Sequence, residues 1–138
     1  MDITKHPQFH LYLLTLHFLM IKNQLIPENS NERWTYGTII NRAYYSAYLY
    51  CELWLEKIKN FKVKPPWEFK PNEKKIGEHK QVRKALFDFG EEETETELKN
   101  LASLRKKADY HPYEEITEDK VTNAIQHMKK IFSHLKFE

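Results

Sequence analysis

The segment at residues 35–59 constrains the fold more than any other part of the chain. Apolar residues recur there every three or four positions, which places them on one face of an α-helix. Additional tyrosine and leucine side chains widen this face. A helix this apolar is expected at the centre of a bundle, in contact with other helices on several sides. Its predicted core stripe is Ile40, Ala43, Tyr44, Ala47, Cys51, Trp54 and Ile58.

Four other segments carry the same helical spacing. Residues 6–25 form the first helix, and residues 76–89 form the third, which ends at Gly90. The fourth covers residues 98–113 and stops at Pro112, after an acidic run that suits a helix N-terminus. The fifth begins after Thr117, an N-cap residue. The sequence therefore predicts an all-α, up-and-down helical bundle of about five helices, with residues 1–138 forming a single domain.

The first and last helices each have a predicted core stripe. The last stripe is continuous and leaves His127 and His134 outside it, so both histidines are expected in solvent. The stripe of the first helix is Leu11, Leu14, Phe18, Ile21 and Leu25. The stripe of the last helix is Val121, Ala124, Ile125, Met128, Ile131, Phe132 and Leu135.

The composition describes a globular chain of 138 residues with a net charge of +2, which implies neither a nucleic acid nor a membrane partner. The single cysteine, Cys51, lies in an apolar run and is expected to be buried, so no disulfide framework is available. The N-terminal residues lack the pattern of a signal peptide, and the longest apolar stretch is too short to span a bilayer. These features favour a cytoplasmic location.

Charged residues collect at the end of the fourth predicted helix. Arg105 and Asp109 are one turn apart and continue the apolar line of Leu98, Leu101 and Ala102, so both are expected to point inward. His111 follows within two residues. Buried charges are costly unless they are paired or used. The group is therefore either a structural ion pair with a surface histidine nearby or a functional site.

Three other patterns have a functional and a structural interpretation. The histidines at positions 6, 10 and 17 share one helix line, but no acidic residue or cysteine accompanies them, so a solvated face is favoured over a metal site. The acidic run at residues 91–97 lacks an interleaved histidine and is favoured as a helix start. Residues 57–84 hold ten Lys or Arg against three Glu, with Phe61, Trp67 and Phe69 among them. This segment is either a solvated loop or a surface for a phosphate backbone.

Three sequence pieces occur in an order that resembles the HEPN family, the higher eukaryotes and prokaryotes nucleotide-binding domain. They are NRAYYSAYLYCELWL, GEHKQVRKAL and LASLRKKADYHPY, followed by a final amphipathic helix. The resemblance is greatest to small stand-alone bacterial members with an Arg-x-x-Ala-Asp-Tyr sequence, here residues 105–110.

The resemblance implies a helical bundle that forms a homodimer. Many HEPN proteins are metal-independent ribonucleases with an Arg, a spacer of four to six residues and a His. Arg105 and His111 are separated by five residues and match this motif. The two motifs of such a dimer meet in one cleft. A variant ends in His-x-Tyr, where a partner nucleotidyltransferase antitoxin modifies the tyrosine, and the corresponding residue here is Tyr113.

The chemistry of RNA cleavage without a metal gives these residues definite roles. A histidine titrates near neutral pH and can transfer the protons of the 2′-hydroxyl and the leaving oxygen. An arginine supplies a planar donor fork for the phosphate. We therefore expect Arg105, His111 and Asp109 to be catalytic, with Asp109 orienting the guanidinium. Asn41, Arg42, Tyr110 and Tyr113 are expected to bind substrate, although no spacing argument places Asn41 or Arg42 in the cleft. His79 is favoured as a packing or capping residue.

Three functions remain open from the sequence. The first is a metal-independent endoribonuclease with neither metal nor cofactor, acting as a toxin or phage-defence effector on RNA. The second is a non-catalytic module that binds nucleotides or protein and pairs with a nucleotidyltransferase. The third is a structural helical domain of a larger complex.

Overall fold

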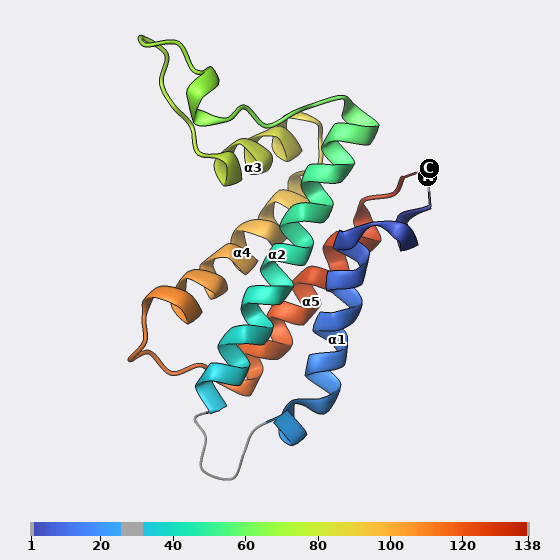
Figure 1. The fold of residues 1–138 in the computed structure, drawn as a ribbon, viewed down its shortest axis with the longest axis vertical. Helices are drawn as coiled ribbons and strands as arrows, with labels where there is room; N and C mark the ends of the chain where they lie inside the picture. Colours follow the sequence, from blue (N-terminus) through green and yellow to red (C-terminus); the bar gives the residue numbers. More distant parts are fainter. Residues whose placement is uncertain (1, 26–31, 138) are drawn as a thin grey trace.

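The computed structural model describes residues 2–25 and 32–137, which form five α-helices and two short 3₁₀ helices without a β-strand in the described part (Figure 1). The chain order is η1 (Ile3–Lys5), α1 (Pro7–Leu25), α2 (Glu32–Lys59), η2 (Pro66–Glu68), α3 (Glu78–Asp88), α4 (Glu92–Tyr110) and α5 (Glu118–His134). The prediction of an all-α bundle of about five helices is confirmed. None of these helices, within the residues described, is long and apolar enough to cross a membrane.

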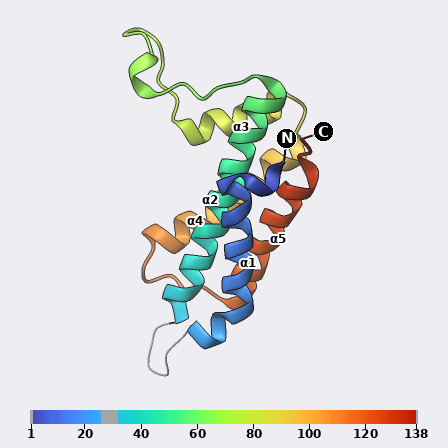
Figure 2. The same ribbon diagram turned by 45° about the vertical axis from the view of Figure 1, so that its right-hand side comes forward.

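The four long helices run side by side, and successive ones point in opposite directions (Figures 1 and 2). Helix α2 lies at the centre and packs against each of the other four helices. The short helix α3 lies across one end of the bundle, beside the last turns of α2. The up-and-down arrangement and the central position of the most apolar helix both agree with the sequence pattern.

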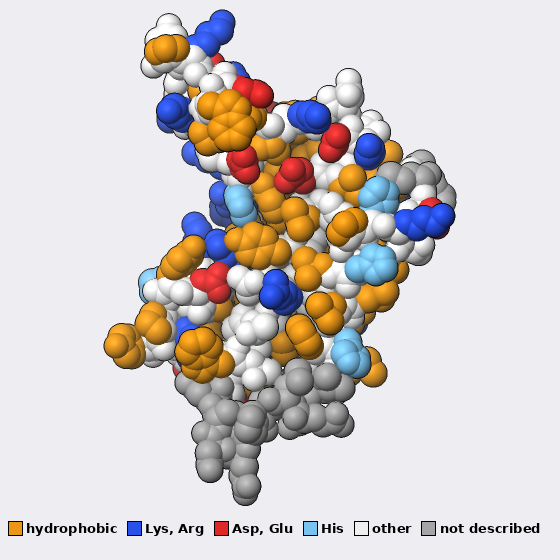
Figure 3. Space-filling view, in the orientation of Figure 1, with side chains coloured by type: hydrophobic (Ala, Val, Ile, Leu, Met, Phe, Trp, Pro, Cys, Tyr) orange, Lys and Arg blue, Asp and Glu red, His pale blue; other side chains and the backbone are white. Residues whose placement is uncertain are grey.

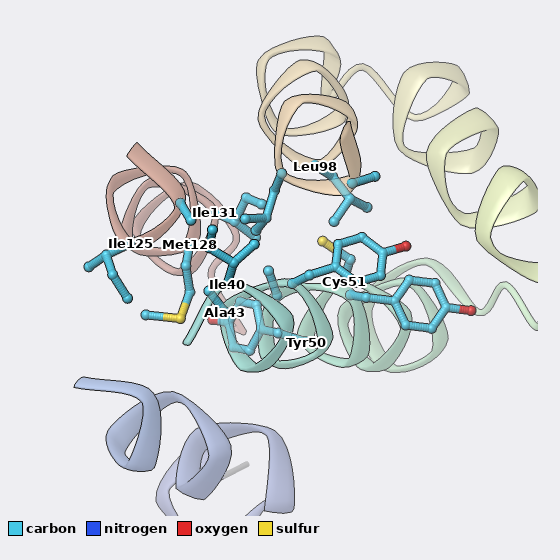
Figure 4. Packing of buried hydrophobic residues seen from close by; sticks show 14 of the residues in the cluster. Ile40, Ala43, Tyr50, Cys51, Leu98, Ile125, Met128 and Ile131 are labelled. Carbon is cyan, nitrogen blue, oxygen red and sulfur yellow. The ribbon is translucent and has the colours of Figure 1, made fainter. Parts of the chain in front are cut away.

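The core lies where α2, α4 and α5 face one another (Figure 4). Ile40 and Cys51 of α2 are fully buried, and Leu98 of α4 and Met128 of α5 pack toward them. The predicted stripe of α2 is therefore confirmed over most of its length. Ile58 is the exception, because the last turn of α2 extends beyond α5 and leaves this side chain 40% exposed.

The predicted stripe of helix α1 is confirmed at Phe18, which packs on the core, but not at Leu14. Leu14 is 44% exposed, whereas Thr15 is completely buried. The Thr15 hydroxyl donates a hydrogen bond of 2.7 Å to the carbonyl of Leu11, which satisfies its polar group inside the helix. The side chains of Ile21 and Leu25, which the same stripe included, lie outside the described residues. The partly buried residues that pack on the core from α1 are Tyr12, Leu16, Phe18 and Leu19.

Local signals set the ends of the remaining helices. Gly90 follows α3 with φ of +86°, a left-handed conformation that glycine adopts without strain. The Thr117 side chain accepts a hydrogen bond from the amide of Lys120, as predicted for the N-cap of α5. Helix α4 begins earlier than the core stripe indicated and includes the acidic residues in its first turn.

The two histidines that were expected in solvent differ in their surroundings, and only the expectation for His127 needs adjustment. His127 does not lie free in solvent, because its Nδ1 contacts Glu97 Oε2 on α4 at hydrogen-bonding range. His134 is exposed, as expected, and its Nε2 lies 3.9 Å from the exposed Glu93. In the basic segment between α2 and α3, Phe61 packs against the core, whereas Trp67 is 83% exposed. Aromatic residues of this segment therefore divide between core and surface.

Candidate functional site

Arg105 projects from α4 toward α2, and its side chain is only 16% exposed. Its Nε atom lies 2.9 Å from Asp109 Oδ2, one helical turn away. The N–H of Nε is not aimed at that oxygen closely enough for a hydrogen bond, so the contact is an ion pair. Nη2 donates to the hydroxyl of Tyr45 at 2.9 Å and, at a longer 3.4 Å, to that of Tyr110. The guanidinium is therefore held by side chains of α2 and of its own helix α4.

Three tyrosine rings surround the guanidinium carbon of Arg105. It lies 5.5 Å from the ring centre of Tyr44 and 5.3 Å from those of Tyr45 and Tyr110. These distances are in the range of cation–π attraction. Burial acts to lower the pKa of Arg105, but the phenols of Tyr45 and Tyr110 and the carboxylate of Asp109 outweigh it, so the pKa is raised. Arg105 stays positively charged.

Asp109 connects this arginine to the N-terminal half of α2. The amide of Asn41 donates a hydrogen bond of 3.0 Å to Asp109 Oδ2, the same oxygen that contacts Arg105. Asn41, Asp109, Arg105 and Tyr45 thus form one continuous polar chain across the contact between α2 and α4. We call Arg105, Asp109, Asn41, Tyr45 and Tyr110 the Arg105 cluster. On the face seen in Figure 3, charged side chains interleave with hydrophobic ones in this part of the molecule.

The predicted residues His111 and Tyr113 lie beyond the end of α4. The backbone amide of His111 still bonds to the carbonyl of Lys107, but its side chain is exposed and its imidazole makes no hydrogen bond or ion pair with a described residue. Tyr113 is completely exposed, and Tyr110 is 64% exposed. The structure joins Arg105, Asp109, Asn41 and Tyr110, and it records no direct contact between Arg105 and His111.

Arg33 holds the end of α4 in place and was not singled out from the sequence. Its guanidinium donates to four backbone carbonyl groups: Nε to Glu114 at 2.9 Å, Nη1 to Ala108 at 3.3 Å, and Nη2 to Lys107 at 3.2 Å and His111 at 2.6 Å. A helix C-terminus leaves carbonyl groups without partners and favours a cation there. Arg33 therefore positions the segment that carries His111.

A pocket of about 410 Å³ opens beside this anchor. The expected substrate-binding residues Asn41 and Arg42 line it, together with Asp109 and the exposed ring of Trp34. Its floor includes Gly37, and a Cβ at this position would lie 3.8 Å from the Cβ of Ala108, at ordinary contact distance. Arg42 lines this pocket, and its side chain makes no hydrogen bond or ion pair with a described residue of the Arg105 cluster. The pocket and the cluster share Asn41 and Asp109.

His79, at the start of α3, is the histidine that the structure connects to the Arg105 cluster. Its Nδ1 is hydrogen-bonded to the hydroxyl of Tyr44, and its ring stacks on that of Tyr48 with 4.1 Å between centres. Burial, followed by the charge of Arg105, lowers the pKa of His79. The expected packing role is correct. Its connection to Arg105 through Tyr44 was not expected.

The tyrosines had a signal in the sequence that could have been used. Tyr45 follows Asn41 by four residues, and Tyr48 follows Tyr44 by four, so each pair shares a helix face. That spacing indicates that polar side chains share one face of the otherwise apolar α2. It does not indicate that α4 is the helix that packs against this face.

Within residues 2–25 and 32–137, no three or more His, Cys, Asp or Glu side chains are grouped so that they could hold a metal ion. Comparisons of the chain with protein-family models, with curated proteins and with solved structures found no match.

Proposed function

We propose that this chain is a HEPN-like, metal-independent ribonuclease in which Arg105 binds the scissile phosphate. The main support for the proposal is that the Arg105 guanidinium is held in place and still has an unbonded donor. It is fixed by Asp109 and Tyr45, while its Nη1 bonds to no described residue and is not enclosed. A fixed cation with a free donor is suited to the negative charge that develops on a phosphate.

Proton transfer in this proposal belongs to His111. Its imidazole is exposed and unengaged, so it is available to a substrate or to a second copy of the chain. A single His111 per chain is few for the two proton transfers of RNA cleavage. The proposal therefore includes a homodimer in which two Arg105 and two His111 side chains share one cleft, acting as a toxin or defence effector.

The test is cleavage of RNA by the purified protein in the presence of a chelator. We expect cleavage by the wild type and a loss of about 10²–10⁴-fold in rate for His111→Ala, the range for removal of a general acid–base group. Arg105→Gln is expected to lose activity as well. His10→Gln, on the exposed face of α1, is the control and should keep full activity. Equal activity of His111→Ala and wild type would refute the proposal.

A second candidate function rests on the exposure of Tyr113, whose side chain is fully open to solvent. In this alternative the chain is a non-catalytic HEPN-like module that partners a nucleotidyltransferase, which transfers a nucleotide to the tyrosine. Co-expression with such a partner should add one or more nucleotide masses to the wild type and none to Tyr113→Phe. An unmodified wild-type chain that cleaves RNA would contradict it.

A further inference from the structure

His79 and Arg105 both lie close to the same pair of tyrosines, Tyr44 and Tyr45. The guanidinium carbon of Arg105 is 5.5 Å from the ring centre of Tyr44, and the ring centre of His79 is 5.6 Å from it. The corresponding distances to the Tyr45 ring are 5.3 Å and 6.2 Å. The imidazole and the guanidinium therefore occupy one small region between α3 and α4. In this region His, basic and hydrophobic side chains lie next to one another on the surface (Figure 3).

The contact with Tyr44 determines which nitrogen of His79 carries the proton. Burial raises the pKa of Tyr44 to about 12, so this side chain is a neutral phenol near neutral pH. A buried phenol needs an acceptor, and Nδ1 of His79 is the partner that the structure provides. With Nδ1 accepting, the neutral imidazole carries its hydrogen on Nε2.

The Nε2 atom is available to a ligand. It bonds to no described residue and is not among the enclosed polar atoms. The stack on Tyr48 and the bond to Tyr44 fix the plane of the ring, so the direction of the Nε2–H is fixed as well. An oriented neutral donor of this kind can bind an anionic oxygen without adding charge.

The surroundings of His79 favour a polyanion over a single small anion. Arg83 follows His79 by one helical turn, and its charge acts on His79 together with that of Arg105, against the opposing carboxylate of the adjacent Glu78. The basic segment that precedes α3 continues the positive charge away from Arg105, and it carries the exposed ring of Trp67. Basic residues with an exposed aromatic ring suit a single-stranded nucleic acid, whose bases stack on aromatic rings.

We propose that the Nε2–H of His79 forms a phosphate subsite next to Arg105, which binds the neighbouring phosphate of a single-stranded RNA and directs that strand toward α3. This inference rests on the proposed function, because it takes RNA as the ligand. It differs from that function in residue and in role. His79 is a binding residue here, and no bond is made or broken at it.

The experiment measures binding of a fluorescent 2′-O-methyl hexaribonucleotide, which cannot be cleaved through its 2′-oxygens, at several salt concentrations. We expect His79→Gln to bind about tenfold more weakly, with an unchanged dependence of affinity on salt, because a neutral donor releases no counterion. Arg105→Gln should bind more weakly and lower the slope of log affinity against log salt by about 0.7, the value for one phosphate of a single strand. His10→Gln is the matched control and should bind like the wild type.

A second variant, Tyr44→Phe, tests the orientation of His79 without removing the imidazole. It keeps the ring and deletes the hydroxyl, and it should weaken binding several-fold because Nδ1 is no longer held. Thermal unfolding checks that each variant is folded, and if His79→Gln is not, Tyr44→Phe decides the question. Wild-type affinity in both folded variants overturns the proposal. A reduced salt slope in His79→Gln also overturns it, since the imidazole would then be charged.

The two proposals fail in different ways. If the wild type binds the hexanucleotide in a His79-dependent manner and cleaves no RNA, the ribonuclease is wrong and the subsite stands. If the wild type cleaves RNA and His79→Gln binds the hexanucleotide normally, the subsite is wrong and the ribonuclease stands. Absence of binding by the wild type refutes the subsite directly.

Discussion

Replacement of Arg33 by glutamine tests how the end of α4 is held. The arginine donates four hydrogen bonds of 2.6–3.3 Å to backbone carbonyl groups between Lys107 and Glu114. A well-formed hydrogen bond from a charged donor contributes about 1.5–3 kcal/mol. The four bonds share one side chain, and those made by Nη2 are exposed, so their contributions do not add. Ordering the long side chain costs up to about 2 kcal/mol.

We therefore expect Arg33→Gln to lower the free energy of unfolding by about 2 kcal/mol, which includes the loss of a cation at a helix C-terminus. For a chain of this size the melting temperature should fall by about 8 °C. Arg42→Gln is the matched control, because Arg42 is exposed on the same helix and lines the same pocket without a backbone carbonyl partner.

The assay is thermal unfolding by circular dichroism, together with amide hydrogen exchange. Exchange should accelerate at His111 and Glu114, whose amides bond to the carbonyls of Lys107 and His111 in the segment that Arg33 holds. Amides in the middle of α2 should change only as much as global stability changes. Equal melting temperatures for Arg33→Gln and Arg42→Gln, or unchanged exchange at His111, would show that the carbonyl contacts do not anchor this segment.

Three further outcomes are expected. Asp109→Ala removes the partner of Arg105 and the acceptor of Asn41, and chemical denaturation should show a loss of about 1–2 kcal/mol, whereas no loss would mean that water replaces the carboxylate. The pKa of His79 is lowered in the fold, so the unfolded chain binds more protons than the folded chain as the pH falls below about 6.5. The free energy of unfolding should therefore keep the full contribution of the neutral His79 above this pH and decrease below it. In urea titrations, His79→Gln should reduce this decrease. Leu101→Ala, at a completely buried position, should lower the free energy of unfolding by about 2–5 kcal/mol. Leu14→Ala, at a side chain that is 44% exposed, should lower it much less. Equal losses would show that Leu14 is part of the core.

The helices and most of the core follow from local pattern. The stripe of α2 predicts six of its buried residues because a periodicity of 3.6 residues determines which side chains share a face. The prediction failed for Leu14, because α1 is apolar on several sides and its rotation is set by neighbours. It also failed for Ile58, because pattern alone does not say where a helix extends past its partners.

The candidate site follows from the sequence in part. The spacing of Arg105 and Asp109 predicts their contact. Arg105 points inward as expected, whereas Asp109, for which the same was expected, is exposed at the edge of the helix contact. The resemblance to HEPN proteins adds His111 and Tyr113 as expectations. The sequence did not predict the partners of Arg105 and Asp109 on α2. Arg105 bonds to Tyr45, 60 positions away, and Asp109 bonds to Asn41, 68 positions away. No local rule relates residues so distant in the chain.

The sequence by itself determined that five amphipathic segments form helices and that the most apolar of them lies at the centre, because both properties depend on neighbours within one or two turns. Tertiary structure decided which polar side chains meet. It brought Arg33 to the end of α4 and His79 to Tyr44, contacts that span up to 81 and 35 positions. The physical reason is that a buried hydrogen-bonding group must find a partner wherever packing of the apolar faces happens to bring one within reach.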